Sequence, residues 1–180
     1  MYREEIAGVK DVDLILDFKL DIIFSSSEVT SMERADMEKM VNYCEEEIRE
    51  NIEKYKILYD DDMIVASYLV DDYCDGKMID FIYVMPDKRN NGIGKYILSN
   101  IINNNYQPIY AWIYKENEIA NQLFKGNNFS TDEESEFKLL LKNNNDKEEN
   151  DIIRIKMFER DVEELSKKYG VEYKLECKNK

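Results

Sequence analysis

The segment 81–95 places an apolar strand, a short proline-containing turn, two glycines and the start of a helix in direct succession. A helix that begins after such a loop has unpaired backbone N–H groups and a partial positive charge at its N-terminus. Gly92 and Gly94 would let a phosphate approach the backbone without interference from Cβ atoms. The segment therefore predicts an anion-binding loop, and Arg89 and Lys95 would add positive charge at its mouth.

Two common phosphate-binding motifs do not fit this loop. A Walker A loop requires Ser or Thr after its Gly-Lys pair, whereas Tyr96 follows Lys95. A dinucleotide-binding fingerprint requires a third glycine, and Ile97 stands at that position. The loop must therefore bind its anion in another structural setting.

The apolar pattern predicts an α/β fold in which strands and helices alternate along most of the chain. Helical spacing of apolar residues predicts helices from 11 or 13 to 22, over 31–52, at 93–102 and at 119–124. Alternation and apolar runs predict a strand within 1–10, a hairpin over 56–73 that turns at 60–62, and strands at 78–86, 108–114 and 136–142. The strand at 108–114 is expected to be buried on both faces.

The end of the chain has a different composition. Residues 143–151 are polar without compensating apolar residues, so they form the best candidate linker. Apolar spacing over 155–169 predicts a helix that stops at Gly170, and 171–177 alternates as a strand. Residues 151–157 alternate as well, so strand and helix both remain open there. We therefore expect a domain at 1–142 and a C-terminal extension at 143–180.

Two segments resemble motifs of the GCN5-related N-acetyltransferases. The residues 89–94 match the pyrophosphate-binding pattern of that family, which is Arg or Gln, two residues, Gly, one residue, and Gly or Ala. The segment 110–129 is similar to the second family motif, in which a strand is followed by Asn, a helix with Ala and Leu, and a terminal Gly-Phe. The fitting positions are Asn117, Ala120, Leu123 and Phe129. Asn128 replaces the usual Gly, and Asn tolerates the left-handed backbone expected there.

The resemblance covers residues 1–142 and implies the acyl-CoA N-acyltransferase fold of that family. In this fold a mixed, mostly antiparallel sheet of six or seven strands is flanked by helices. The resemblance also implies acetyl-CoA as cosubstrate, with no metal. Residues 143–180 lie outside the resemblance and would form a helix-strand extension after the polar linker.

The resemblance also assigns residues to the cosubstrate. A β-bulge in this family separates the fourth strand from the fifth, and the pantetheine arm lies in the opening. Backbone groups around Ile82, Tyr83 and Val84 would bind that arm and polarise the thioester carbonyl. Asn117 would meet the arm near the sulfur atom. The pyrophosphate would be held by the loop residues Arg89, Asn90, Asn91, Gly92, Ile93, Gly94 and Lys95.

The resemblance matches the catalytic groups less completely than the CoA-binding residues. Asp80 is the candidate general base, because strict alternation places it on the strand face of Ile82 and Val84; alternatively, it only opens the strand after the Gly76 turn. Many family members use a Tyr to reprotonate the CoA thiolate, and Phe124 stands at that position.

Three alternatives for the protonation of the CoA thiolate remain open. Tyr114 or Tyr83 takes over the role, water protonates the thiolate, or turnover has been lost while CoA binding is kept. Phe124 would then contribute to the CoA site only through apolar contact.

The amino-acid composition excludes several classes of function. The 180 residues include 39 acidic and 25 basic side chains and no histidine, giving a net charge of −14. Nucleophilic systems that depend on histidine and His-ligated zinc are therefore excluded. The three cysteines, Cys44, Cys74 and Cys177, lack CxxC spacing, and no apolar run is long enough to span a membrane, so we expect a cytoplasmic protein with reduced thiols.

The negative charge disfavours nucleic acid and anionic membranes as partners and favours cations. Acidic clusters at 45–47, 60–62 and 71–72 would attract a cationic acceptor or are simply solvated surface. The resemblance, together with this charge, implies an N-acetyltransferase acting by direct attack on a primary amine of a small cationic metabolite, an antibiotic or a peptide. The alternative is a non-catalytic acyl-CoA-binding module. A third hypothesis is that 151–177 pairs with a second subunit, which would make a homodimer.

Overall fold

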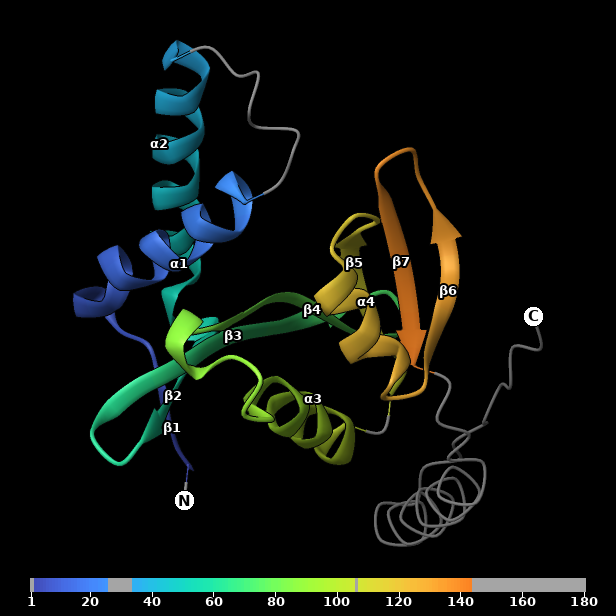
Figure 1. The fold of residues 1–180 in the computed structure, drawn as a ribbon. Helices are drawn as coiled ribbons and strands as arrows, with labels where there is room; N and C mark the ends of the chain where they lie inside the picture. Colours follow the sequence, from blue (N-terminus) through green and yellow to red (C-terminus); the bar gives the residue numbers. More distant parts are fainter. Residues whose placement is uncertain (1, 26–33, 106, 144–180) are drawn as a thin grey trace, which may run out of the picture. The chain divides into compact units, whose positions relative to one another are not determined.

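The computed structural model describes residues 2–25, 34–105 and 107–143, which form a sheet with helices on both of its faces (Figure 1). The described strands are β1 (Tyr2–Ile6), β2 (Tyr55–Asp60), β3 (Met63–Tyr73), β4 (Gly76–Val84), β5 (Ile109–Tyr114), β6 (Phe129–Glu134) and β7 (Lys138–Asn143). The described α-helices are α1 (Val12–Phe24), α2 (Arg34–Asn51), α3 (Ile93–Asn104) and α4 (Glu118–Lys125).

The described strands form one seven-stranded sheet in the order β1-β2-β3-β4-β5-β7-β6. Every neighbouring pair is antiparallel except β4 and β5, which are parallel. The connection between these two parallel strands contains α3, as a parallel pair requires a crossover. The predicted fold class, a mixed and mostly antiparallel sheet of six or seven strands flanked by helices, is confirmed.

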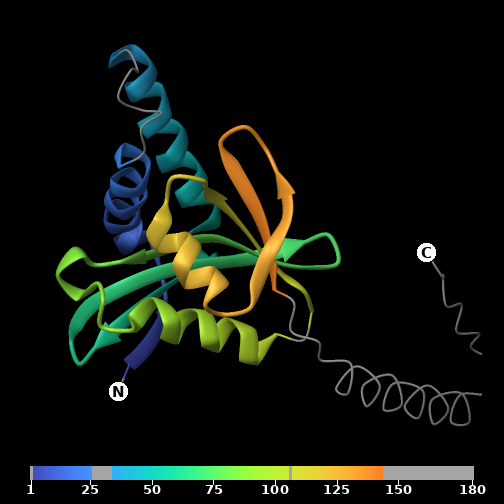
Figure 2. The same cartoon turned by 45° about the vertical axis from the view of Figure 1, so that its right-hand side comes forward.

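Each face of the sheet carries its own apolar core. Helices α1 and α2 cover one face, where Ile15, Ile48 and Phe81 are buried together. Helices α3 and α4 cover the other face, where Leu98 and Phe124 belong to a larger buried cluster. Figure 2 shows α1 and α2 on the opposite side of the sheet from α3. The two faces therefore present different surfaces to a ligand that lies between the strands.

The sheet opens at its centre, between β4 and β5. The two strands pair only where residues 77–79 of β4 lie beside residues 109–111 of β5, and beyond Ala111 they diverge. At the same level the β3–β4 register shifts, because Leu69 lies opposite Phe81 whereas Val70 lies opposite Ile79. Asp80 is therefore the extra residue of a β-bulge, which bends a strand and increases its local twist.

Most predicted elements are confirmed, with three corrections. Strand β6 was not expected, because five of its six residues are exposed and only Phe129 is buried, so it has no apolar alternation. The strand predicted at 108–114 is not buried on both faces, since Trp112 is 40% exposed. The predicted linker includes residue 143, which instead ends β7. The predicted helix start at Ser31, the rest of the predicted linker, and the predicted C-terminal helix and strand lie outside the described residues.

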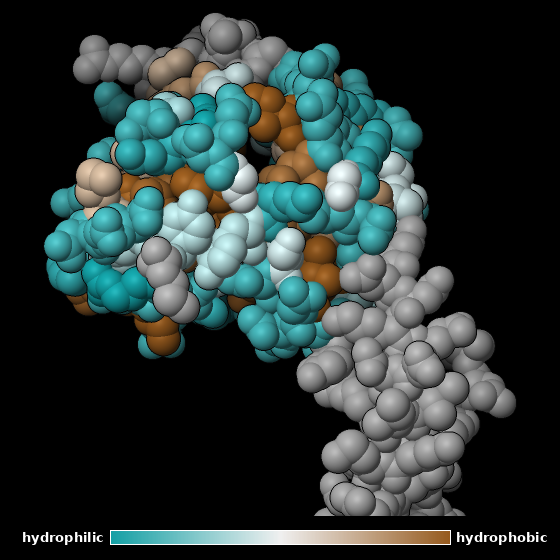
Figure 3. Space-filling view, turned by 60° about the horizontal axis from the view of Figure 1, so that its bottom comes forward, coloured by the Kyte–Doolittle hydropathy of each residue, from teal (hydrophilic) through white to brown (hydrophobic). Residues whose placement is uncertain are grey.

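Figure 3 shows one face of the described part, on which hydrophilic side chains predominate and apolar side chains reach the surface around a hollow. The large apolar side chains that are exposed include Ile6, Val9 and Ile119. None of the described helices combines the length and the apolar character that crossing a membrane requires.

Candidate active site

The backbone of β4 offers hydrogen-bonding groups to the opening between β4 and β5. Met85 N–H donates to Val65 C=O of the neighbouring chain segment over 3.0 Å. Backbone groups in an antiparallel pair alternate in direction, so Tyr83 pairs toward β3, while the N–H and C=O of Ile82 and Val84 point toward the opening. Of the three residues expected to bind the pantetheine arm by their backbone, Ile82 and Val84 have the required direction and Tyr83 does not.

The N-terminus of α3 has the features of an anion site. Gly92 is the N-cap residue with φ 79° and ψ 2°, in the left-handed region, and Asn90 also has a positive φ of 64°. No side chain caps this helix end. The first intrahelical bond runs from Tyr96 N–H to Gly92 C=O over 2.9 Å, so the amides of 93–95 precede the helical ladder. These amides and the helix dipole favour a bound anion.

The two glycines of the loop have different functions. A Cβ atom at Gly92 would meet nothing within 4 Å, so this position combines a left-handed backbone with open space. A Cβ atom at Gly94 would lie 3.2 Å from Leu123 Cδ2. Open space of the kind expected for a phosphate is therefore present at Gly92, whereas Gly94 permits the close packing of α3 on α4.

Arg89 does not stand free at the mouth of the loop. Its Nε donates to Val84 C=O over 3.0 Å, and its Nη2 lies 3.4 Å from Asp21 Oδ2 of α1. Its guanidinium carbon also lies 5.4 Å from the centroid of the Tyr83 ring. The guanidinium is therefore turned toward β4 and α1. The expected positive charge at the loop mouth comes more directly from Lys95, which is exposed.

The remaining loop residues contribute through the backbone or support the turn. Asn91 Nδ2 donates to Lys88 C=O over 3.2 Å, which closes the turn before the helix. The Ile93 side chain is buried in the core, so only its amide faces a ligand. Asp87 pairs with Lys88 at 3.5 Å and partly offsets its charge.

Asp80 lies on the α1 and α2 face of the sheet. Ile82 and Val84 pack against the core on the α3 face, whereas the charged neighbours of Asp80 include Lys19 of α1 and Glu47 of α2. The alternation argument that put Asp80 on the face of Ile82 and Val84 is wrong, because the bulge adds one residue and reverses the side-chain direction before it.

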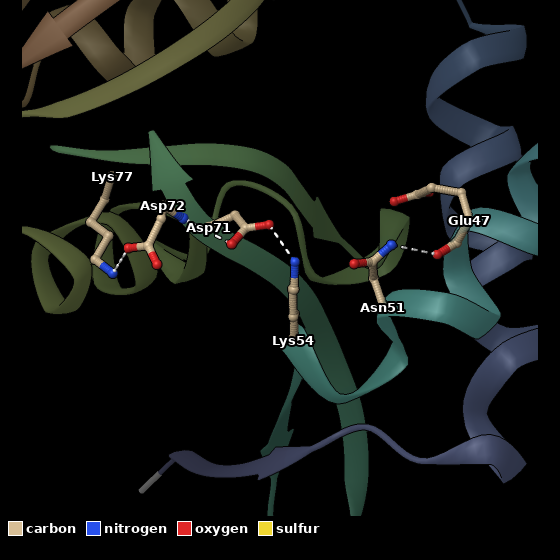
Figure 4. Close-up of polar contacts among 6 residues, drawn as sticks. All are labelled: Glu47, Asn51, Lys54, Asp71, Asp72 and Lys77. Atoms are coloured by element: carbon tan, nitrogen blue, oxygen red, sulfur yellow. Dashed lines mark hydrogen bonds and ion pairs between the residues drawn. The ribbon is translucent and has the colours of Figure 1, made fainter. Parts of the chain in front are cut away.

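The environment of Asp80 makes it a plausible base on geometric and electrostatic grounds. Its side chain keeps an exposed surface, yet desolvation of the carboxyl group, followed by the negative charge of Asp71, raises its pKa. No hydrogen bond or ion pair joins it to another residue of the described ranges. Its neighbour Asp71 is instead bound by Lys54 at 2.6 Å, which lowers the pKa of Asp71 (Figure 4).

A second group of polar side chains lies between α1, α2 and β2. Lys19 Nζ pairs with Glu47 and lies 3.5 Å from the Tyr55 hydroxyl. Burial raises the pKa of Tyr55 to about 12. Figure 4 shows Glu47 beside Asn51, whose side-chain amide donates to the Glu47 carbonyl over 3.0 Å. The sequence did not single out Lys19 or Tyr55, since residues on three separate elements leave no local pattern.

The expected proton donors differ in their surroundings. Phe124 is buried, and its ring lies 5.0 Å from that of Phe129 in the α3-face core. Tyr114 is half-buried at the end of β5, with Lys138 Nζ 4.6 Å from its ring centroid. The Tyr83 hydroxyl donates to Asp21 over 2.8 Å, and its pKa is raised by burial and by this bond, which makes it a weaker acid.

Asn117 begins α4. Its side-chain Oδ1 accepts from Ala120 N–H over 2.9 Å, so the carboxamide oxygen caps the helix. The carboxamide nitrogen is the group of this side chain that remains to meet a ligand. Asn117 thus has a structural function in addition to the one that the resemblance assigns.

Comparisons with known proteins agree with this architecture. No protein-family model matches the sequence, and no curated protein matches it significantly. Among solved structures, the PaiA N-acetyltransferase from Thermoplasma acidophilum, in complex with coenzyme A, gives a TM-score of 0.64 at 9% identity and covers 79% of this chain and 98% of its own. A GNAT-family acetyltransferase from Bacillus cereus gives 0.57 at 21% identity, covering 79% and 96%.

A third structure shows the same likeness inside a longer protein. The N-acetylglutamate synthase from Neisseria gonorrhoeae, complexed with coenzyme A and N-acetyl-glutamate, gives a TM-score of 0.58 at 16% identity over 79% of this chain and 35% of its own. The fold of this chain is therefore that of the GCN5-related N-acetyltransferases.

Proposed function

We propose that this chain is a GCN5-related N-acetyltransferase that transfers an acetyl group from acetyl-CoA to the primary amine of a small cationic metabolite, an antibiotic or a peptide. The observation that carries the proposal is the opening between β4 and β5, which begins at the bulge and lies next to the uncapped N-terminus of α3. Two of the similar structures contain coenzyme A, which supports the same ligand here.

The backbone groups of β4 and of the start of α3 suit the proposed cosubstrate, acetyl-CoA. The pantetheine arm would run along β4, where Ile82 and Val84 direct backbone groups outward. The pyrophosphate would meet the amides at the start of α3, over the open space beside Gly92, with Lys95 nearby. Backbone N–H groups facing the opening would stabilise the negative charge that develops on the thioester oxygen during attack.

Direct attack requires an acceptor amine without its extra proton. A free aliphatic ammonium has a pKa near ~10, so a base must accept that proton. Asp80 is the proposed base, because its carboxylate lies at the level where the strands diverge and its pKa is raised by desolvation and by Asp71. Water or Tyr114 would supply the proton to the leaving thiolate, whose conjugate thiol has a pKa near ~8.5.

One observation favours a second candidate function. Phe124 occupies the position of the usual acid and is buried in the core, so it offers no proton. A non-catalytic acyl-CoA-binding module would need the opening and the α3 N-terminus but neither an acid nor a base.

A free-thiol assay separates the two candidates. The protein is incubated with acetyl-CoA and a panel of polyamines, aminoglycosides, amino acids and short peptides, and the release of CoA thiol is followed. Thiol release that depends on one amine establishes the transferase and its acceptor class. Tight CoA binding without release on the whole panel supports the binding module and counts against the transferase.

A further inference from the structure

Asp21 connects α1 to β4 and to the loop that follows β4. Its Oδ2 accepts a hydrogen bond from the Tyr83 hydroxyl over 2.8 Å and lies 3.4 Å from Arg89 Nη2. One turn earlier on the same helix, the Phe18 ring stacks on Tyr83 with 4.4 Å between centroids and 16° between planes. The end of α1 is thus attached to β4 and to the loop through these contacts.

The position of Asp21 in its helix is unfavourable without such partners. It lies in the last turn of α1, which contains no basic residue, and the C-terminal end of a helix carries partial negative charge. A carboxylate there is disfavoured by the helix dipole. Arg89 supplies the compensating positive charge, so the Asp21 carboxylate is paired with a cation and is not merely solvated by water.

Arg89 also begins the loop that leads to the anion site, three residues before Gly92. Its Nε is engaged by Val84 C=O and its Nη2 by Asp21, while the side chain is 44% exposed and therefore accessible to a ligand. A pyrophosphate bound at the α3 N-terminus carries more negative charge than one carboxylate. It would therefore compete with Asp21 for the same guanidinium.

We infer that Asp21 and the pyrophosphate of CoA are alternative anionic partners of Arg89, so that CoA binding and the attachment of α1 to the loop oppose each other. The inference rests on the proposed function, because it takes CoA as the ligand. Asp21 is in this account a positioning residue that acts through Arg89. By thermodynamic linkage, loss of the Asp21 charge strengthens CoA binding.

The test is a double-mutant cycle read by calorimetric titration with CoA. Asp21→Asn removes the charge but keeps an oxygen that accepts from Tyr83. Asp17→Asn is the matched control, since Asp17 is an exposed acid on the same helix without a contact to Arg89. Arg89→Gln, alone and combined with Asp21→Asn, completes the cycle. Thermal unfolding of each variant verifies that it is folded.

The expected result is that Asp21→Asn binds CoA about two- to fivefold more tightly than the wild type, the range for an exposed ion pair, and that the gain shrinks at high salt. Asp17→Asn binds like the wild type. In the Arg89→Gln background, Asp21→Asn has no effect on the CoA affinity, because the guanidinium through which Asp21 acts is absent. A purely structural function of Asp21 would instead weaken binding or leave it unchanged.

The inference and the proposed function fail in different ways. If the wild type binds CoA but Asp21→Asn shows no gain over Asp17→Asn, or the gain persists without Arg89, the inference is overturned and the proposed function stands. If the wild type does not bind CoA, both are overturned.

Discussion

Asp80 is the extra residue of the β-bulge in β4, and its desolvated carboxyl group lies near the negative charge of Asp71. A carboxylate with a raised pKa stabilises the folded state only while it is protonated; this contribution is fully present below the unfolded pKa and is lost as the pH rises through the folded pKa. Above its folded pKa the ionised Asp80 therefore contributes no stability through this shift. Such a residue is typical of functional sites, where stability is exchanged for reactivity.

Asp80→Asn is accordingly expected to separate activity from stability. If Asp80 is the base, kcat falls by about 10²-fold or more, while the melting temperature at neutral pH does not decrease. Asp72→Asn is the matched control, because the Asp72 side chain is 85% exposed and its removal changes the charge equally. Equal activity of the two variants would remove Asp80 from the mechanism.

The same carboxyl predicts the acid side of the pH profile. Activity that needs ionised Asp80 is lost as the pH falls through its pKa, and desolvation with Asp71 nearby moves this loss above the pH range of an ordinary Asp. The pH dependence of kcat/KM measures it. If the acid limb stays at the pH of an ordinary carboxyl, or persists unchanged in Asp80→Asn, another group is responsible.

Gly92 is expected to matter for the ligand more than for the fold. Gly92→Ala places a Cβ on a left-handed backbone and costs about 1–2 kcal/mol, whereas Gly92→Asn costs less because Asn tolerates this conformation. Both variants add atoms in the open space assigned to the pyrophosphate, so both weaken CoA binding. Chemical denaturation and calorimetry measure the two effects; retained CoA affinity in Gly92→Asn would move the anion away from this space.

At the scale of elements, α3 combines a core function with a ligand function. Leu98 is fully buried, so Leu98→Ala is expected to lower the free energy of unfolding by about 2–5 kcal/mol. Lys95 is exposed, so Lys95→Ala changes stability by less than about 0.5 kcal/mol and weakens CoA binding by about two- to fivefold. Denaturant unfolding and CoA titration of both variants measure this division. A large stability loss in Lys95→Ala would contradict it.

Elements with strong apolar periodicity could be predicted from the sequence. The helix at Ile93–Asn104 and the hairpin of β2 and β3 follow directly from their spacing. Strand β6 could not be predicted, because an edge strand with exposed acidic residues has no alternation to detect. The bulge at Asp80 could not be predicted from alternation either, since it is a relation between two strands.

The candidate site could likewise be predicted only where a local sequence motif encodes it. Local motifs identified the loop before α3 and singled out Asn117, but they did not indicate that Asn117 caps α4. They did not indicate that Arg89 is bound to Asp21, because these residues are far apart in sequence and meet only through packing of α1 on β4. They also did not indicate that a Cβ atom at Gly94 would lie 3.2 Å from Leu123 Cδ2.

At the scale of the whole molecule, the described residues contain a complete sheet with a core on each face. A chain that ends after Asn143 is therefore expected to fold cooperatively and to bind CoA as the full chain does. Thermal unfolding and titration measure this. The mass of the particle in solution, compared between the two chains, tests whether 144–180 mediates a homodimer; an unchanged mass counts against that hypothesis.

In the proposed function, the opening of the sheet at Asp80 and the uncapped start of α3 together form an acyl-CoA site. Calorimetric titration of the wild-type protein with CoA is the decisive experiment for this site. We expect saturable binding to one site per chain, weakened in Gly92→Asn and Lys95→Ala. The absence of binding by the wild type, or binding that neither variant alters, would contradict it.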